Sequence, residues 1–138
     1  MSINPYLFFD GRAEEALAFY KKVLGAKEGM VLRYKDAPKE ALANMKPGTL
    51  DKIMHMSFKV GDSDLMGSDG HCNGEPNFQG FSLSYSAKDD AEADRVFKAL
   101  SDGGQVRQPL EKTFFASKFG MVADKFGLGW MILSGPQS

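Results

Sequence analysis

The residues with the widest chemical range in this sequence are its two histidines, His55 and His71. His55 lies within the apolar segment Met54-His55-Met56-Ser57-Phe58. An imidazole with an ordinary pKa near 6.5 can act as a general base, a proton shuttle or a hydrogen-bond partner for an anion. A strand over this segment would place His55 and Ser57 on one face of a sheet. His55 is therefore the candidate catalytic residue; a buried histidine bonded to a neighbouring carbonyl is the open alternative.

The second histidine is followed directly by the only cysteine, Cys72, in a segment rich in Gly, Asn and Pro. A metal site at His71 and Cys72 needs at least two further ligands, and Asp69 and Glu75 are the only candidates nearby. We expect solvated loop residues here and no metal site.

Further polar side chains interrupt segments that are otherwise apolar. Ser82 and Ser84 break an apolar strand, and Thr113 precedes a Phe-Phe pair. Hydroxyls on an inward face can orient a small polar ligand, and serines that face solvent are equally ordinary. Tyr6 and Trp130 each combine an apolar ring with one polar group, which suits a pocket wall or the edge of a core. The candidate ligand-binding residues are Tyr6, His55, Ser57, Ser82, Ser84, Thr113 and Trp130.

Periodicity predicts the elements that position these residues. Residues 12–24 have the spacing of an amphipathic helix that ends at Gly25. A second helix is expected over 90–101, capped by Asp89 or Asp90, with an inward face of Ala91, Val96, Phe97 and Leu100. Apolar or alternating segments predict strands over 3–9, 28–35, 52–60, 63–68, 80–87, 105–109, 114–123 and 128–134. The polar stretch 36–51 predicts a long loop with a helical turn near 39–45.

The chain also repeats itself. Ala13-Glu14, Phe19 and Gly25 recur as Ala91-Glu92, Phe97 and Gly103, at a constant offset of 78 residues. The order strand-helix-strand-strand-strand therefore occurs twice. This predicts a single α+β domain, residues 1–138, of two βαβββ modules over 1–70 and 78–138, joined by the Gly/Asn/Pro-rich linker. Pseudo-symmetric domains often bind their ligand in the cleft between the halves, and we expect the site there.

Composition and charge exclude several classes of function. The chain has 17 basic and 18 acidic residues, without a Lys/Arg block, so it lacks the basic patch that nucleic-acid binding needs. No apolar run approaches the length of a membrane span, and the first residues do not resemble a signal peptide. A single cysteine excludes an internal disulfide. We expect a cytoplasmic protein with neither nucleic-acid nor membrane partners.

Five stretches, in this order, resemble the PhnB-like branch of the vicinal-oxygen-chelate superfamily, which includes glyoxalase I, extradiol dioxygenases and bleomycin-resistance proteins. They are Pro5-Tyr6-Leu7 with Gly11, Lys52-Ile53-Met54-His55, Leu65-Met66 with Ser68-Asp69, Gly103-Gly104 with Pro109-Leu110, and Thr113-Phe114 through Phe119-Gly120-Met121 to Asp124, Phe126-Gly127 and Trp130-Met131. The resemblance covers nearly the whole chain. It implies a curved mixed sheet around a cleft, and a homodimer.

The resemblance also implies where a divalent metal would be held. The superfamily takes its ligands from the first and last strand of each half. Those positions fall at residues 4–6, at residues 66–68, at Ser82 or Ser84, and at Met131. Because this is no set of ligands for a hard metal, we expect no metal ion and no other cofactor.

Three functions follow, and whether the protein is an enzyme stays open. The first is binding of a small oxygenated metabolite or drug-like molecule in the cleft between the modules. The second is a metal-dependent lyase, isomerase or dioxygenase, with His55 as base. The third is a module that binds a protein partner without small-molecule chemistry.

Overall fold

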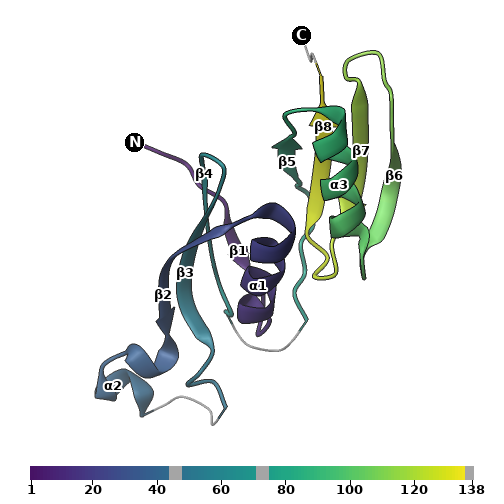
Figure 1. Ribbon diagram of the computed structural model, residues 1–138. Helices are drawn as coiled ribbons and strands as arrows, with labels where there is room; N and C mark the ends of the chain where they lie inside the picture. Colours follow the sequence, from purple (N-terminus) through teal and green to yellow (C-terminus); the bar gives the residue numbers. More distant parts are fainter. Residues whose placement is uncertain (44–47, 71–74, 136–138) are drawn as a thin grey trace. The chain divides into compact units, whose positions relative to one another are not determined.

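The computed structural model describes residues 1–43, 48–70 and 75–135 (Figure 1). The chain divides into two compact units, Met1–Pro76 and Asn77–Ser138. Each unit has the order strand, helix, strand, strand, strand. The predicted α+β class and the two βαβββ modules are confirmed.

The first unit contains a four-stranded mixed sheet. Its elements are β1 (Tyr6–Phe8), α1 (Ala13–Leu24), β2 (Lys27–Arg33), the 3-10 turn η1 (Tyr34–Asp36), the short helix α2 (Lys39–Leu42), β3 (Ile53–Val60) and β4 (Ser63–Ser68). The strand order is β1-β4-β3-β2. The first strand pairs with the last in parallel, and the other pairs are antiparallel.

The second unit has the same arrangement. Its elements are β5 (Leu83–Ser86), α3 (Asp90–Ser101), β6 (Gln105–Glu111), β7 (Lys118–Ala123) and β8 (Gly129–Ser134). The strand order is β5-β8-β7-β6, again with the first and last strands parallel. Two segments with different sequences therefore adopt one topology.

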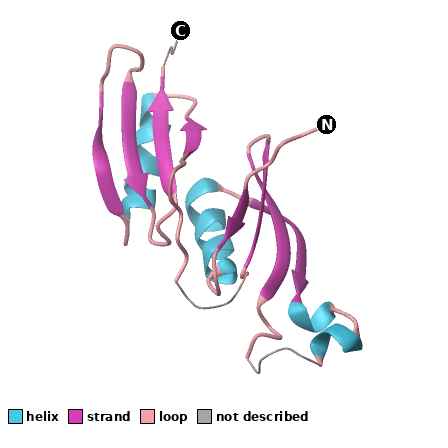
Figure 2. Ribbon diagram, turned by 180° about the vertical axis from the view of Figure 1, so that it is seen from behind, coloured by secondary structure: helices cyan, strands magenta, loops and turns pink. Residues whose placement is uncertain are grey.

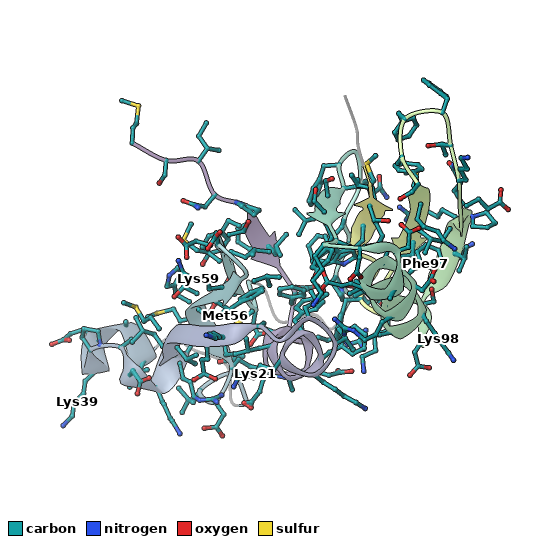
Figure 3. All side chains as sticks on the ribbon, turned by 45° about the horizontal axis from the view of Figure 1, so that its top comes forward. Lys21, Lys39, Met56, Lys59, Phe97 and Lys98 are labelled. Carbon is teal, nitrogen blue, oxygen red and sulfur yellow. The ribbon has the colours of Figure 1, made fainter. Side chains whose placement is uncertain are left out.

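In each unit the long helix covers one face of the sheet, with buried side chains between them; in the second unit a smaller apolar cluster of Ala116, Phe119 and Leu133 lies on the other face. In the first unit the Tyr20 ring of α1 stacks on Phe58 of β3, with ring centroids 5.9 Å apart. In the second unit, Figure 2 shows the strands in front of α3. Figure 3 labels Phe97, which lies against the sheet, and Lys98, which projects away from it. Within each unit taken by itself, no helix among the described residues covers the opposite face of the sheet.

The inward face of α3 differs from the prediction at one position. Ala91 is exposed, and Ala93 is fully buried instead. The identical residues of the two helices are 78 positions apart in the sequence, whereas their buried positions are 77 apart. The pattern of side-chain burial, not residue identity, determines which positions of the two helices are equivalent. The matched buried positions are Ala16, Phe19 and Val23 in α1 and Ala93, Val96 and Leu100 in α3.

Several strand ends also differ from the prediction. The first strand is only Tyr6–Phe8, and the segment 114–123 becomes a strand only from Lys118, because Thr113 N donates to Ala116 O and closes a turn. Within the described ranges, the two longest helices have 12 residues each, and no helix is long and apolar enough to cross a membrane.

Candidate functional site

The face of the first sheet that lies opposite α1 carries all three predicted site residues of this unit. Leu7 and Met56 are buried toward α1, so their neighbours Tyr6, Phe8, His55 and Ser57 point to the opposite side. Strand register adds residues of β4 to the same side, since Met66 is the partner of both Tyr6 and Ser57. We call this side the open face; its residues are Tyr6, Phe8, Lys27, Leu32, His55, Ser57, Lys59, Asp64 and Met66.

Two predicted site residues are in direct contact on the open face. The Tyr6 hydroxyl oxygen lies 3.0 Å from His55 Nδ1, and the two rings stack with centroids 5.6 Å apart. Phe8 continues the aromatic row, with its ring centroid 5.1 Å from that of Tyr6. His55 is half-buried, and its Nε2 has no hydrogen-bond partner among the described residues. The pair therefore presents one imidazole nitrogen to a ligand.

Ser57 has a structural bond in addition to its place on the open face. Its Oγ accepts a hydrogen bond from Met30 N at 2.9 Å, where the register of β2 shifts against β3. Gly29 lies beside this hydroxyl, and a Cβ added there would approach Ser57 Oγ to 2.5 Å. Ser57 thus fixes the bulge of β2 while its own proton remains available to a ligand.

The candidates of the second unit do not gather into one group. Ser84 is exposed and is the strand partner of Met131 on the face opposite α3. Ser82 lies next to Gly129, where an added Cβ would meet its Oγ at 2.8 Å. Thr113 accepts from Phe115 N, which makes it part of the turn between β6 and β7. These three roles stay predictions as ligand contacts.

Trp130 lies in the core of the second unit. Only 4% of its surface is exposed, and its Nε1 donates to Asp124 Oδ2 at 2.9 Å. The other carboxylate oxygen of Asp124 accepts from Phe126 N and Leu128 N, so one aspartate organises the β7–β8 turn. The indole N–H is therefore bonded within the protein, and the ring is buried. Trp130 has little surface left for contact with a ligand.

The positions where the resemblance would place a metal include one pair of strand partners in each unit. In the first sheet Tyr6 lies opposite Met66, and in the second Ser84 lies opposite Met131. A phenol, a hydroxyl and two thioethers do not suit a hard divalent cation, which prefers carboxylates and imidazoles. Within the described ranges no group of three or more His, Cys, Asp or Glu residues can hold a metal ion. The candidates His71 and Cys72 lie outside those ranges.

Sequence reasoning missed Phe8 and Met66 as neighbours of the Tyr6–His55 pair. The signal was present in the alternation of Tyr6-Leu7-Phe8, because residues two apart on a strand share a face. Phe8 is 59% exposed, which is unusual for so large an apolar side chain. The open face therefore combines exposed aromatic surface with one histidine.

A shallow groove on the other side of the first sheet contains none of the predicted site residues. It has a volume of about 230 Å³ and lies between α1 and β2, over Leu17, Val31 and Ile53. Arg33 Nη1 lies 2.8 Å from Glu14 Oε1 at its rim, and this contact raises the pKa of the Arg33 guanidinium. The charged rim is thereby paired within the protein.

Comparison with known proteins gives a consistent family. Residues 1–133 match a family model described as 3-demethylubiquinone-9 3-methyltransferase. Protein YjdN of Escherichia coli is 33% identical over 96% of this chain and 94% of its own length. The structure of protein PA1353 from Pseudomonas aeruginosa superimposes with a TM-score of 0.84 at 38% identity, covering 99% and 98% of the two chains.

Two further solved structures extend the comparison. A putative 3-demethylubiquinone-9 3-methyltransferase, PhnB protein, from Bacillus cereus is 28% identical, with a TM-score of 0.81 over 98% of this chain and all of its own. A glyoxylase/bleomycin resistance protein/dioxygenase domain from Frankia has a TM-score of 0.66 at 14% identity, over all of this chain and 94% of its own. The last likeness shows a shared fold.

Proposed function

The chain belongs to the PhnB-like family described as 3-demethylubiquinone-9 3-methyltransferase, within the vicinal-oxygen-chelate superfamily, and on this premise we propose that it binds a small oxygenated metabolite or drug-like molecule without a metal ion. The single observation that supports the proposal is the Tyr6–His55 pair on the open face, next to the exposed ring of Phe8. A ligand site of this kind combines apolar walls with a few polar groups that fix orientation.

Independence from metal follows from the chemistry of the ligand positions. The resemblance puts the superfamily's metal positions at residues 4–6 and 66–68, at Ser82 or Ser84, and at Met131. Side chains of these types can bind a ligand through hydrogen bonds and apolar contacts.

Methyl transfer, which the family description mentions, is not part of the proposal. Cofactors with a nucleotide-like body bind where a glycine-rich turn leads from a strand into a helix. The turns that lead from β1 into α1 and from β5 into α3, residues 9–12 and 87–89, contain one glycine between them, Gly11.

A thermal-shift screen on protein dialysed against a chelator tests the proposal. Small oxygenated molecules that bind are expected to raise the melting temperature of the metal-free protein. His55→Ala should abolish that rise, whereas Ser63→Ala, an exposed position at the start of β4, should leave it unchanged. Ligands that bind only after zinc, nickel or iron is added, or a stoichiometric metal in the purified protein, would favour the metal-dependent enzyme instead.

A protein partner, including a second copy of this chain, is the second candidate, and one observation favours it. Phe114 is fully exposed at the β6–β7 turn, and its ring centroid lies 5.2 Å from that of Phe115, which packs on an apolar cluster of Ala116, Phe119 and Leu133. Apolar surface of this kind is typical of an interface. We expect light scattering to give the mass of a homodimer, and we expect Phe114→Ser to weaken that dimer. A monomeric mass for the unsubstituted protein would contradict this second candidate.

A further inference from the structure

The hydrogen-bond polarity of the open face follows from the Tyr6–His55 contact. A neutral imidazole has one nitrogen that donates and one that accepts. The imidazole nitrogen is far more basic than a phenol oxygen, so the stronger arrangement has the Tyr6 hydroxyl donating to His55 Nδ1 at 3.0 Å. The proton of the imidazole is then on Nε2. Tyr6 is thus a positioning residue that makes His55 present a donor.

Ser57 offers a second donor on the same face. Its Oγ already accepts from Met30 N at 2.9 Å, and the hydroxyl proton is free to rotate toward a ligand. His55 and Ser57 are two residues apart on β3, so their Cα atoms are roughly 6–7 Å apart. Two donors at this spacing suit one ligand with several acceptor atoms.

The charges on the open face favour an anion. Lys27 and Lys59 are strand partners, and Lys59 Nζ lies 3.2 Å from Asp64 Oδ1. Two lysines against one aspartate leave an excess of one positive charge at this end of the open face. A ligand that brings a negative charge gains from this excess at moderate ionic strength.

The apolar neighbours favour a flat body. Phe8 and Tyr6 form an aromatic row, and Met66, which is partly buried, lies opposite Tyr6. Aromatic rings pack well on such a surface, and a thioether adapts to their outline.

We propose that the ligand of the open face is an oxyanion on a flat apolar body, of the aromatic carboxylate class, whose oxygens accept from His55 Nε2 and Ser57 Oγ. This inference rests on the proposed function. The two side-chain donors would take the place of the divalent metal that the superfamily resemblance implies.

The tautomer of His55 can be measured without any ligand. Long-range ¹H–¹⁵N spectra at pH 8.5, where an ordinary imidazole is neutral, distinguish a protonated Nε2 from a protonated Nδ1. The chain has only two histidines, so a His71→Gln variant assigns the signals. We expect His55 to carry its proton on Nε2 and to show Nδ1 as an acceptor. A proton on Nδ1 would overturn the inference.

Three probes that share the naphthalene ring and differ in charge test the ligand class by calorimetry on metal-free protein: 2-naphthoate, naphthalene and 2-naphthylmethylammonium. We expect the carboxylate to bind about tenfold more tightly than either of the others, in line with hydrogen bonds to a charged acceptor. His55→Leu should remove this preference, and His55→Gln, whose amide retains a donor, should keep most of it.

The role of Tyr6 has a matched control in the second unit. Tyr6→Phe leaves the imidazole free to adopt either tautomer, and should weaken 2-naphthoate binding about fivefold with little change for naphthalene. Tyr85→Phe also removes one phenol hydrogen bond, to Glu92, and should change neither affinity.

The outcomes separate this inference from the proposed function. If naphthalene or the ammonium probe binds as tightly as the carboxylate, or if no probe binds while the chelator-treated protein still binds members of the screen, the inference fails and the proposed function stands. If neither the probes nor the screened molecules bind, both fail.

Discussion

The two units share one topology, and in each a carboxylate links the long helix to the sheet. The carboxylate comes from the sheet side in the first unit and from the helix in the second. In the first unit Asp69, which follows β4, accepts from Ala13 N at the start of α1 and from Ile53 N at the start of β3. In the second unit the carboxylate is on the helix, where Asp90 accepts from the hydroxyls of Ser117 and Ser134. The fold requires a polar link at this junction without specifying which element supplies it.

The helix starts explain the difference. α3 has a local cap, since the Asp89 side chain accepts from Glu92 N at 2.8 Å. α1 begins after Arg12, which has no oxygen to accept such a bond, and Asp69 accepts from the helix start across 56 residues of chain instead. Where the local sequence lacks a cap, the buried end of a strand provides one.

The largest expected effect is at Asp124, a turn carboxylate that is buried in the second unit, whereas Asp62 in the corresponding turn of the first unit is exposed. Asp124→Ala leaves two backbone N–H groups and the Trp130 indole without their acceptor, which should cost roughly 3–5 kcal/mol of unfolding free energy in urea denaturation followed by circular dichroism. Asp62→Ala, in the exposed β3–β4 turn of the first unit, is the control and should change stability by less than about 0.5 kcal/mol. Equal effects would contradict the comparison.

Next in size is the junction itself. Asp69→Ala leaves Ala13 N and Ile53 N unpaired in a site where Asp69 is only 1% exposed, and should cost roughly 2–4 kcal/mol. Asp90→Ala should cost clearly less, because its two partner hydroxyls have alternative partners: Ser117 Oγ also donates to Ser134 O at 3.1 Å and lies 3.5 Å from Ser134 Oγ.

The only tryptophan, Trp130, is in the second unit, so its fluorescence reports on that unit alone. In the Asp69→Ala variant, the first unit should unfold at a lower urea concentration than the second. The circular dichroism signal, which reports on both units, should therefore begin to fall before the tryptophan fluorescence changes. A common transition for both signals would indicate that the destabilisation is not confined to the first unit.

A smaller effect is expected from pH. The hydroxyls of Ser117 and Ser134 lower the pKa of the Asp90 carboxyl, with the Ser117 bond the larger cause. A lowered folded-state pKa adds stability above the unfolded-state value, about 3.9, and that stability is lost as pH falls through the folded-state pKa. Asp90→Asn should therefore be less stable than wild type at pH 6, with the difference shrinking below about pH 4. A difference independent of pH would contradict this assignment.

The smallest effect is expected at the Tyr6–His55 pair. Tyr6 is 38% exposed, so water can replace its hydrogen bond, and Tyr6→Phe should cost less than about 0.5 kcal/mol. A larger loss in urea denaturation would indicate that the pair holds the sheet together and is not reserved for a ligand.

The sequence predicted the elements well where periodicity was strong. The segments 63–68 and 90–101 agree with β4 and α3 at both ends. Ala91 was wrong because alanine matches either face of a helix, so its identity carries little information about burial. The strand expected from residue 114 starts later because Thr113 closes a turn, which apolar content cannot reveal.

The sequence allowed the types of residue in the candidate site to be predicted, but not which residues contact one another. Tyr6 and His55 were both selected, yet their contact joins positions 49 residues apart, through the pairing of strands β1, β4 and β3. Trp130 was selected for its polar indole, and the donor proved to be bonded to Asp124, a residue that looked like an ordinary turn former. A side chain such as tyrosine or tryptophan can serve either the core or a ligand site, and only its tertiary contacts show which role it has.

The parallel pairing of β1 with β4 has a consequence for biosynthesis. As the chain emerges from the ribosome, β1 has no strand to bond until β3 and β4 have also been made, since β4 separates it from the rest of the sheet. Closure of that non-local pair is the entropically costly step, so β1 stays unpaired until then. Leu7 and the adjacent Phe9, which the folded unit buries, remain exposed during that time. A nascent chain stalled before residue 63 should therefore be a better substrate for chaperones than one stalled after residue 76.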